Sequence, residues 1–254
     1  MSIELLLASF ASLCAGMIDA IVGGGGLVLV PALFATFPAA PPASLLGTNK
    51  CASVWGTLMA SRQYARRVQI NWRVLLPAAG FALAGGLLGA WAVTQMDPAF
   101  LRRMLPIVLV AVFAYTLWNK GLGTVHAPRF SAGAELAMAC AIGAVIGFYD
   151  GFFGPGTGSF FIFLLVRLLG YDFLHASASA KILNVATNLS ALALFAAKGH
   201  VWWQVGLTMA VANIAGSVIG TRLALKYGAG FVRRAFIGVV GALILKSAYD
   251  ALIR

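Results

Sequence analysis

Two stretches of the chain place a carboxylate and a run of glycines within apolar sequence: GMIDAIVGGGG at 16–26 and GFYDGFFGPGTG at 147–158. Asp19 and Asp150 are costly to bury, and the glycines with Pro155 interrupt a helix. A helix that restarts after such a break exposes unpaired N–H groups and its positive dipole end, which together bind anions. The two stretches therefore predict an anion site between broken helices. Its candidate backbone positions are Gly23, Gly24, Gly25, Gly26, Gly154, Pro155, Gly156, Thr157 and Gly158.

Each break is followed by a segment that carries a lysine, in LLGTNK ending at Lys50 and in ASASAK ending at Lys181. A charged side chain within a membrane span is expensive and indicates a functional site. We expect both lysines to supply charge to the anion, with Asn49 and Ser179 as further hydrogen-bond donors. The alternative is that both lysines lie near helix starts and extend to the membrane surface. The sequence leaves both interpretations open.

Other polar residues have two interpretations each. Asp19 and Asp150 either take part in ion coupling, for example as proton relays, or only accept hydrogen bonds from backbone exposed at the breaks. Asn184, Thr187 and Asn188 recur at i, i+3 and i+4 and so share one helix face. That face either lines a pathway or joins neighbouring helices.

The elements that position these residues are membrane helices. The chain is 61% hydrophobic and only 10% charged, whereas soluble domains carry about 25% charged residues. Its apolar runs have the length of about 20 residues that a bilayer requires. We predict long helices at 3–22, 43–61, 74–95, 104–119, 132–153, 179–197, 204–225 and 235–253. Two shorter apolar segments, 27–37 and 159–170, follow the glycine breaks.

The chain contains an internal repeat. Asp150 lies 131 positions after Asp19, and Lys181 lies 131 positions after Lys50. Glycine, tryptophan and arginine residues match at the same offset, so we divide the chain into repeats 1–120 and 132–254, joined by a linker at 121–131. If each glycine break is a hairpin tip, most arginines and lysines fall on one side of the membrane. This favours inverted repeats, with the linker in the cytoplasm and both termini outside.

The predicted fold is thus an all-α polytopic membrane protein of two inverted repeats, each with four long helices and a short re-entrant or broken helix. Outside the site, glycines spaced four apart indicate close helix packing: Gly85, Gly89, Gly216 and Gly220. Cys14, Cys51 and Cys140 are predicted to be small buried side chains. The net charge of +11 is attributed to membrane orientation, so no nucleic-acid partner is expected.

The Asp before each glycine-rich break, the GPGTG form of the second break and the lysine-bearing helix after each break resemble the TauE/SafE family. The resemblance covers both halves of the chain, and GFYDGFFGPGTGSFF is its more specific motif. It implies an ion-coupled transporter in the cytoplasmic (inner) membrane, most simply an exporter of sulfite or organosulfonates. The coupling ion would be one such as H⁺, and the other partner is the lipid bilayer.

The alternatives are a carrier of another small organic anion, such as a carboxylate, and a non-transporting assembly protein. An enzyme is not expected, because His126, His175 and His200 are scattered and no nucleophile or metal motif accompanies them. GPGTG is not a phosphate-binding P-loop, because no Gly-Lys-Ser/Thr follows it. We expect no cofactor and no metal site, and the sequence does not give the oligomeric state.

Overall fold

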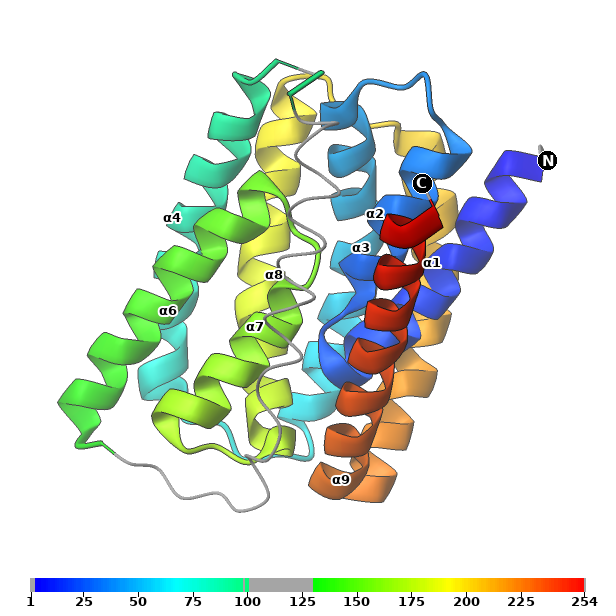
Figure 1. The fold of residues 1–254 in the computed structure, drawn as a ribbon. Coiled ribbons are helices and arrows are strands. Elements are labelled where there is room, and N and C mark those ends of the chain that lie inside the picture. Colours follow the sequence, from blue (N-terminus) through cyan, green and yellow to red (C-terminus); the bar gives the residue numbers. More distant parts are fainter. Residues whose placement is uncertain (1–2, 98, 101–129, 254) are drawn as a thin grey trace.

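The computed structural model describes residues 3–97, 99–100 and 130–253, and all regular structure within them is helical (Figure 1). The first half of the chain contributes α1 (Ile3–Val22), α2 (Gly25–Thr36), α3 (Pro42–Ala65) and α4 (Trp72–Thr94). The second half contributes α6 (Ala132–Phe152), α7 (Thr157–Leu164) continued by the π-helical turn Leu165–Leu169, α8 (Phe173–Ala197) and α9 (Trp203–Ile253). The polytopic all-α class is confirmed.

The predicted long segments correspond closely to these helices. Five of them are long and apolar enough to cross a membrane: α1, α4, α6, α8 and residues 203–232 of α9. The predicted separation of 204–225 from 235–253 appears as a break inside α9, at Gly228 with φ 69° and ψ −167°. The predicted segment 104–119 lies outside the described residues, as does most of the linker 121–131.

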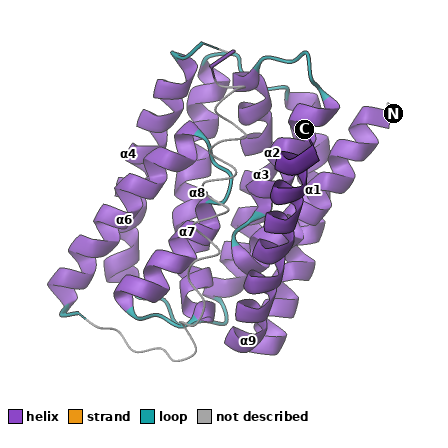
Figure 2. Ribbon diagram, in the orientation of Figure 1, coloured by secondary structure: helices purple, strands orange, loops and turns teal. Residues whose placement is uncertain are grey.

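The two segments that follow the breaks are short, as predicted. α2 has 12 residues and the 157–169 segment has 13, eight in α7 and five in the π turn. At 1.5 Å per residue each measures about 20 Å, less than the ~30 Å hydrocarbon thickness. Figure 2 shows the loop stretches before them inside the bundle, away from the loops at its two ends.

The four predicted packing glycines lie where helices cross closely. A Cβ atom at Gly89 in α4 would stand 2.0 Å from the carbonyl oxygen of Phe148 in α6. One at Gly216 in α9 would stand 1.9 Å from that of Leu13 in α1. Such distances exclude a side chain, so these glycines permit the α4–α6 and α1–α9 contacts. All four predicted packing glycines would meet a backbone carbonyl oxygen in this way: Gly85, Gly89, Gly216 and Gly220.

These contacts repeat at the offset of 131 positions. Gly16 packs on Asn213, and their counterparts Gly147 and Ala82 pack on each other in the same way. In Figure 1, α1 and α6 run in opposite directions, with the start of α1 at the top of the view and the start of α6 at the bottom. The division into repeats and their inverted placement in a membrane stay predictions, since the structure contains no bilayer.

The cysteine prediction is only partly right. Cys51 is buried beside Gly206, whereas Cys14 and Cys140 are half-buried, and all three are free thiols. Cys14 and Cys140 lie on helix faces that other helices cover only in part. The sequence does not show which positions are covered, because lipid-facing and core-facing positions are both apolar.

Candidate functional site

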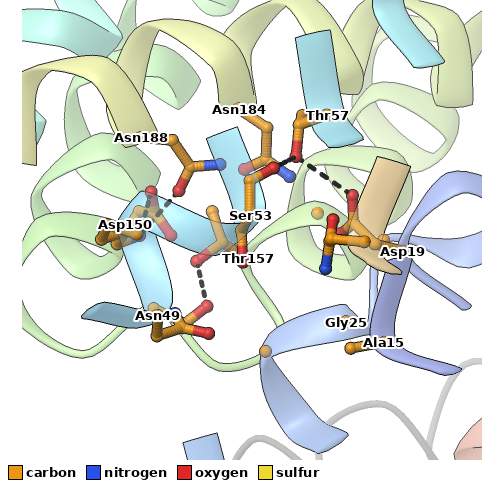
Figure 3. Close-up of a pocket in the computed structure, with 16 residues that line it drawn as sticks. Ala15, Asp19, Gly25, Asn49, Ser53, Thr57, Asp150, Thr157, Asn184 and Asn188 are labelled. Atoms are coloured by element: carbon orange, nitrogen blue, oxygen red, sulfur yellow. Dashed lines mark hydrogen bonds and ion pairs between the residues drawn. The ribbon is translucent and has the colours of Figure 1, made fainter. Parts of the chain in front are cut away.

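A small polar cavity lies where the two glycine breaks meet, among α1, α3, α6, α8 and α9 (Figure 3). Its volume is about 30 Å³, which is room for about two water molecules. The residues around it come from both halves of the chain: Ala15, Asp19, Gly23, Gly25, Gly26, Asn49, Lys50, Ser53, Thr57, Asp150, Gly154, Thr157, Gly158, Asn184, Asn188 and Asn213.

Two buried ion pairs cross between the halves at this cavity. Lys50 Nζ lies 2.7 Å from Asp150 Oδ2, and Lys181 Nζ lies 2.9 Å from Asp19 Oδ2. Lys50, Asp150 and Lys181 are at most 3% exposed. Lys181 and Asp150 are the counterparts of Lys50 and Asp19 at the offset of 131 positions. Each lysine therefore pairs with the carboxylate of the other half of the chain. Asp19 and Asp150 occupy opposite sides of the cavity in Figure 3.

The lysines lie deep in their helices. Lys50 follows Pro42, the first residue of α3, by eight residues, and Lys181 follows Phe173, the first of α8, by the same number. Eight residues of α-helix rise about 12 Å. α8 begins six residues earlier than the predicted segment 179–197, because the side chain of Asp172 caps the helix by accepting the N–H groups of Leu174 and His175. The ammonium groups therefore end on carboxylates inside the protein rather than at the membrane surface.

The two breaks contact each other through the backbone. Gly23 and Gly154 both have positive φ, 75° and 88°, a conformation that favours glycine. The N–H of Ser159 donates to the carbonyl of Gly23 at 3.0 Å, and its hydroxyl donates to the carbonyl of Val22 at 2.9 Å. A Cβ at Gly23 would lie 2.2 Å from the carbonyl carbon of Gly158. Gly23 thus needs glycine for both backbone conformation and space, and Gly154 needs it for its backbone conformation.

The helix starts present available donors to the cavity. The N–H groups of Gly25 and Gly26 at the start of α2, and of Gly158 in the first turn of α7, form no hydrogen bond to other described backbone. No side chain caps either helix. The side-chain oxygen of Asn49 is also buried without a partner among the described residues. The three N–H groups, with the ammonium groups of Lys50 at the cavity wall and Lys181 behind it, are donors that match an anion, whereas the Asn49 oxygen is an acceptor and is not one of them.

The predicted polar face of α8 divides in two. Asn188 Oδ1 accepts a hydrogen bond from Lys50 Nζ at 3.1 Å, and Asn184 also lines the cavity. Thr187 instead lies against Gly86 of α4, where a Cβ would approach the Thr187 Cα to 3.2 Å. The face therefore both borders the cavity and packs helices together.

Ser179 lies elsewhere. It borders a second cavity of about 300 Å³ together with Glu135, Tyr171 and His175. Burial, and next the hydrogen bond to Glu135, raise the pKa of the Tyr171 hydroxyl, so it stays protonated and donates to that carboxylate. Ser179 is two residues before Lys181, which turns it about 200° away around the helix. Of the predicted residues, Gly24, Pro155, Gly156 and Lys181 stand behind the cavity wall rather than in it.

Three further polar residues at the cavity were not among the predicted site residues, although the sequence places Ser53 and Thr57 131 positions before Asn184 and Asn188. Thr57 Oγ1 lies 3.4 Å from Asp19 Oδ2, and Ser53 accepts the Thr57 hydroxyl on its carbonyl at 2.9 Å. Asn213 of α9 donates to the carbonyl of Ser12 at 3.0 Å. An amide within the apolar run 204–225 is the signal that could have indicated Asn213. No group of three His, Cys, Asp or Glu suited to a metal occurs in the described part of the chain.

Membrane-length helices around a central pair of broken helices, with ionisable groups buried at the breaks, define a membrane transporter. The comparison with known families agrees: the model of the sulfite exporter TauE/SafE family matches residues 8–247. The chain belongs to the TauE/SafE family.

Curated relatives bear transporter names. The chain is 37% identical over 240 residues to "Probable membrane transporter protein ORF9" of Sinorhizobium sp, covering 94% of this chain and 90% of the relative. It is 36% identical over 236 residues to a "Probable membrane transporter protein" of Haemophilus influenzae, covering 93% and 91%. It is 35% identical over 242 residues to "Probable membrane transporter protein YfcA" of Escherichia coli K12, covering 95% and 88%. No solved structure matches the chain.

Proposed function

We propose that the chain carries a small oxyanion, sulfite or an organosulfonate, out of the cell across the cytoplasmic membrane, coupled to the movement of protons. The observation that carries the proposal is the pair of buried lysines beside uncapped helix starts, each held by the carboxylate of the other half. The family name, which describes a sulfite exporter, supports the choice of substrate.

Charge counting supports coupling to a cation. The cluster of Lys50, Lys181, Asp19 and Asp150 is neutral when all four groups are ionised. An anion that enters alone would leave one negative charge without a partner in a buried site, at a cost of several kcal/mol. A proton taken up by Asp150 or Asp19 with the anion restores neutrality and releases the paired lysine. The anion then replaces the carboxylate as that lysine's partner. Because proton and anion then cross together, export requires an outward anion gradient larger than the inward proton gradient.

The donors suit the oxygens of such a substrate. In the proposed complex the N–H groups of Gly25, Gly26 and Gly158 bind oxygen atoms, and the amide of Asn49 supplies a further hydrogen bond. Lys50 supplies charge from the cavity wall, and Lys181 does so once it leaves Asp19. The present volume of about 30 Å³ does not admit a sulfite ion, so substrate binding requires the ion pairs to separate and the breaks to move apart.

The orientation is part of the same proposal. The two repeats, 1–120 and 132–254, stand inverted across the cytoplasmic membrane, with the linker 121–131 in the cytoplasm and both termini outside. The distribution of arginine and lysine supports this side assignment. The opposite directions of α1 and α6 support the inversion (Figure 1).

Flux into vesicles tests the function. Purified protein reconstituted in liposomes should transport sulfite or methanesulfonate, and an imposed pH gradient should drive accumulation. A panel that includes small carboxylates separates the oxyanion proposal from an organic-acid carrier. A complete absence of flux for every anion, from protein that retains its helical content, would favour an assembly protein instead.

The lysines are tested with a matched control. Lys50→Met and Lys181→Met should each weaken anion binding about ten- to a hundredfold, since one charge-assisted hydrogen bond contributes about 1.5–3 kcal/mol. Lys198→Met removes an exposed lysine that donates to Thr94 at 2.9 Å and should have no effect. Unchanged affinity in both lysine variants would mean that the helix starts alone bind the anion. The flux assay would still decide whether the protein is a transporter.

A further inference from the structure

A second basic region lies at one end of the bundle, separate from the transport cavity. The end of α3, the start of α8 and the last turns of α9 before Gly228 surround a cavity of about 600 Å³. We call it the basic cavity. It is lined by Gln63, Arg66, Arg67, Leu174, Arg222, Leu225 and Lys226.

The charge of the basic cavity is uncompensated by the described protein. Four of its seven lining residues are cations and none is acidic. Among the described residues none of the four cations forms an ion pair, and Lys226 has only the ring of Tyr227, 5.3 Å from its ammonium group. Four like charges around one cavity repel one another and attract an anion.

The internal repeat shows that the fold does not require these cations. The residues 131 positions from Arg222 and Lys226 are Trp91 and Gln95, at the corresponding end of α4. Those 131 positions from Arg66 and Arg67 are Ala197 and Lys198, at the end of α8. α9 contacts α3 and, at the corresponding positions of the repeat, α4 contacts α8, yet only one end has the four cations. They therefore serve something specific to that side of the membrane.

The cavity is also partly apolar. Leu174 and Leu225 line it beside the cations. The neighbouring Tyr227 is 54% exposed, as expected of an aromatic ring at the membrane interface. Since α3 ends at Ala65 and the first part of α9 breaks at Gly228, we place the cavity at headgroup depth. A ligand that fits has a negative group for the arginines and an apolar part for the leucines.

We propose that the basic cavity binds the headgroup of an anionic phospholipid, with the phosphate between Arg66 and Arg222 and the glycerol and upper acyl chains against Leu174 and Leu225. A guanidinium group binds two phosphate oxygens at once, which favours arginine over lysine in such a site. The lipid supplies the counter-charge that the protein lacks and joins the end of α3 to α9.

The test compares lipids and matched variants in the purified full-length protein. Native mass spectrometry measures the affinity for phosphatidylglycerol and for phosphatidylcholine of the same chain length. The double variant Arg66→Gln/Arg222→Gln removes two cations from the cavity. The control Arg62→Gln/Arg73→Gln removes two exposed arginines from the same end of the bundle that do not line it.

We expect the wild type and the control to bind phosphatidylglycerol more tightly than phosphatidylcholine. The cavity variant should lose about 25-fold in affinity for phosphatidylglycerol, since each cation near a membrane surface contributes about fivefold. Equal affinity for the two lipids in the wild type, or equal losses in both double variants, would overturn the proposal. So would displacement of phosphatidylglycerol by millimolar inorganic phosphate, which would identify a small-anion site instead.

Discussion

Asp150→Asn is the substitution that most directly tests the exchange of partners at the transport cavity. Asparagine has nearly the shape of aspartate but no charge, so it imitates the protonated carboxylate. Lys50, whose Nζ lies 2.7 Å from Asp150 Oδ2 in the wild type, faces a neutral side chain in the variant and is free to bind an anion. If the wild-type anion must displace Asp150 from Lys50, the variant should bind the anion without taking up a proton there.

The expected magnitude follows from that ion pair. Removing one partner of a buried pair costs about 3–5 kcal/mol, so the anion-free variant should unfold more easily than the wild type. Anion binding should become about ten- to a hundredfold tighter at neutral pH. The hydrogen bond from Lys50 to the anion, about 1.5–3 kcal/mol, then forms without first displacing a carboxylate from the lysine. Anion at a hundred times its Kd should restore about 2.7 kcal/mol of stability.

The assay is calorimetric titration of purified protein with methanesulfonate, which stays a monoanion throughout the neutral range. Wild-type affinity should rise as the pH falls, by at most about tenfold per pH unit for one proton taken up. The variant should show a smaller slope, and Asp97→Asn, at an exposed carboxylate, should match the wild type. An Asp150→Asn protein with wild-type affinity and wild-type pH slope would refute the exchange of partners.

Other predictions follow from the breaks, the helix crossings and the orientation. Gly156→Leu should abolish flux while the protein still inserts, because φ at this residue is 83° and a side chain is strained there. The control is Gly80→Leu, since no atom lies within 4 Å of the Cβ position at Gly80. Equal flux in the two variants would contradict the requirement for glycine. Gly216→Ala should lower stability by about 1–3 kcal/mol through overpacking at its 1.9 Å contact, measured by thermal unfolding against Gly80→Ala. Cysteines introduced at Ser2 and Arg254 should both react with a membrane-impermeant maleimide added outside cells, and labelling of only one would exclude the inverted arrangement.

Much of the fold was predictable because a bilayer limits helix length and makes glycine breaks conspicuous. The short helices α2 and α7 were located by Gly-rich runs that no ordinary span contains. The start of α8 was predicted six residues late, since 173–178 includes His175 and Ser177 and looks more polar than a span. Asp172 nevertheless begins the helix there by capping its first turn.

The candidate site was predicted in part. The lysines, the carboxylates and the breaks do come together, because they sit at the same positions in two copies of one motif. The partners of the lysines were not predicted, since the pairs join α3 to α6 and α8 to α1 and depend on how the two halves pack rather than on spacing along the chain. Ser179 was assigned to the wrong cavity for a similar reason: proximity in sequence to Lys181 does not place two side chains on one helix face.

The crossed ion pairs have a consequence for biogenesis. Asp19 and Lys181 are 162 positions apart, and at about 5–20 residues per second the ribosome takes roughly 8–30 s to make the second after the first. During that time the nascent first half holds Asp19 and Lys50 in membrane segments without their final partners. Each such charge costs about 2.5–3.5 kcal/mol on insertion. Early helices therefore have reason to stay near the translocon until the second half arrives, and the two halves should depend on being made together.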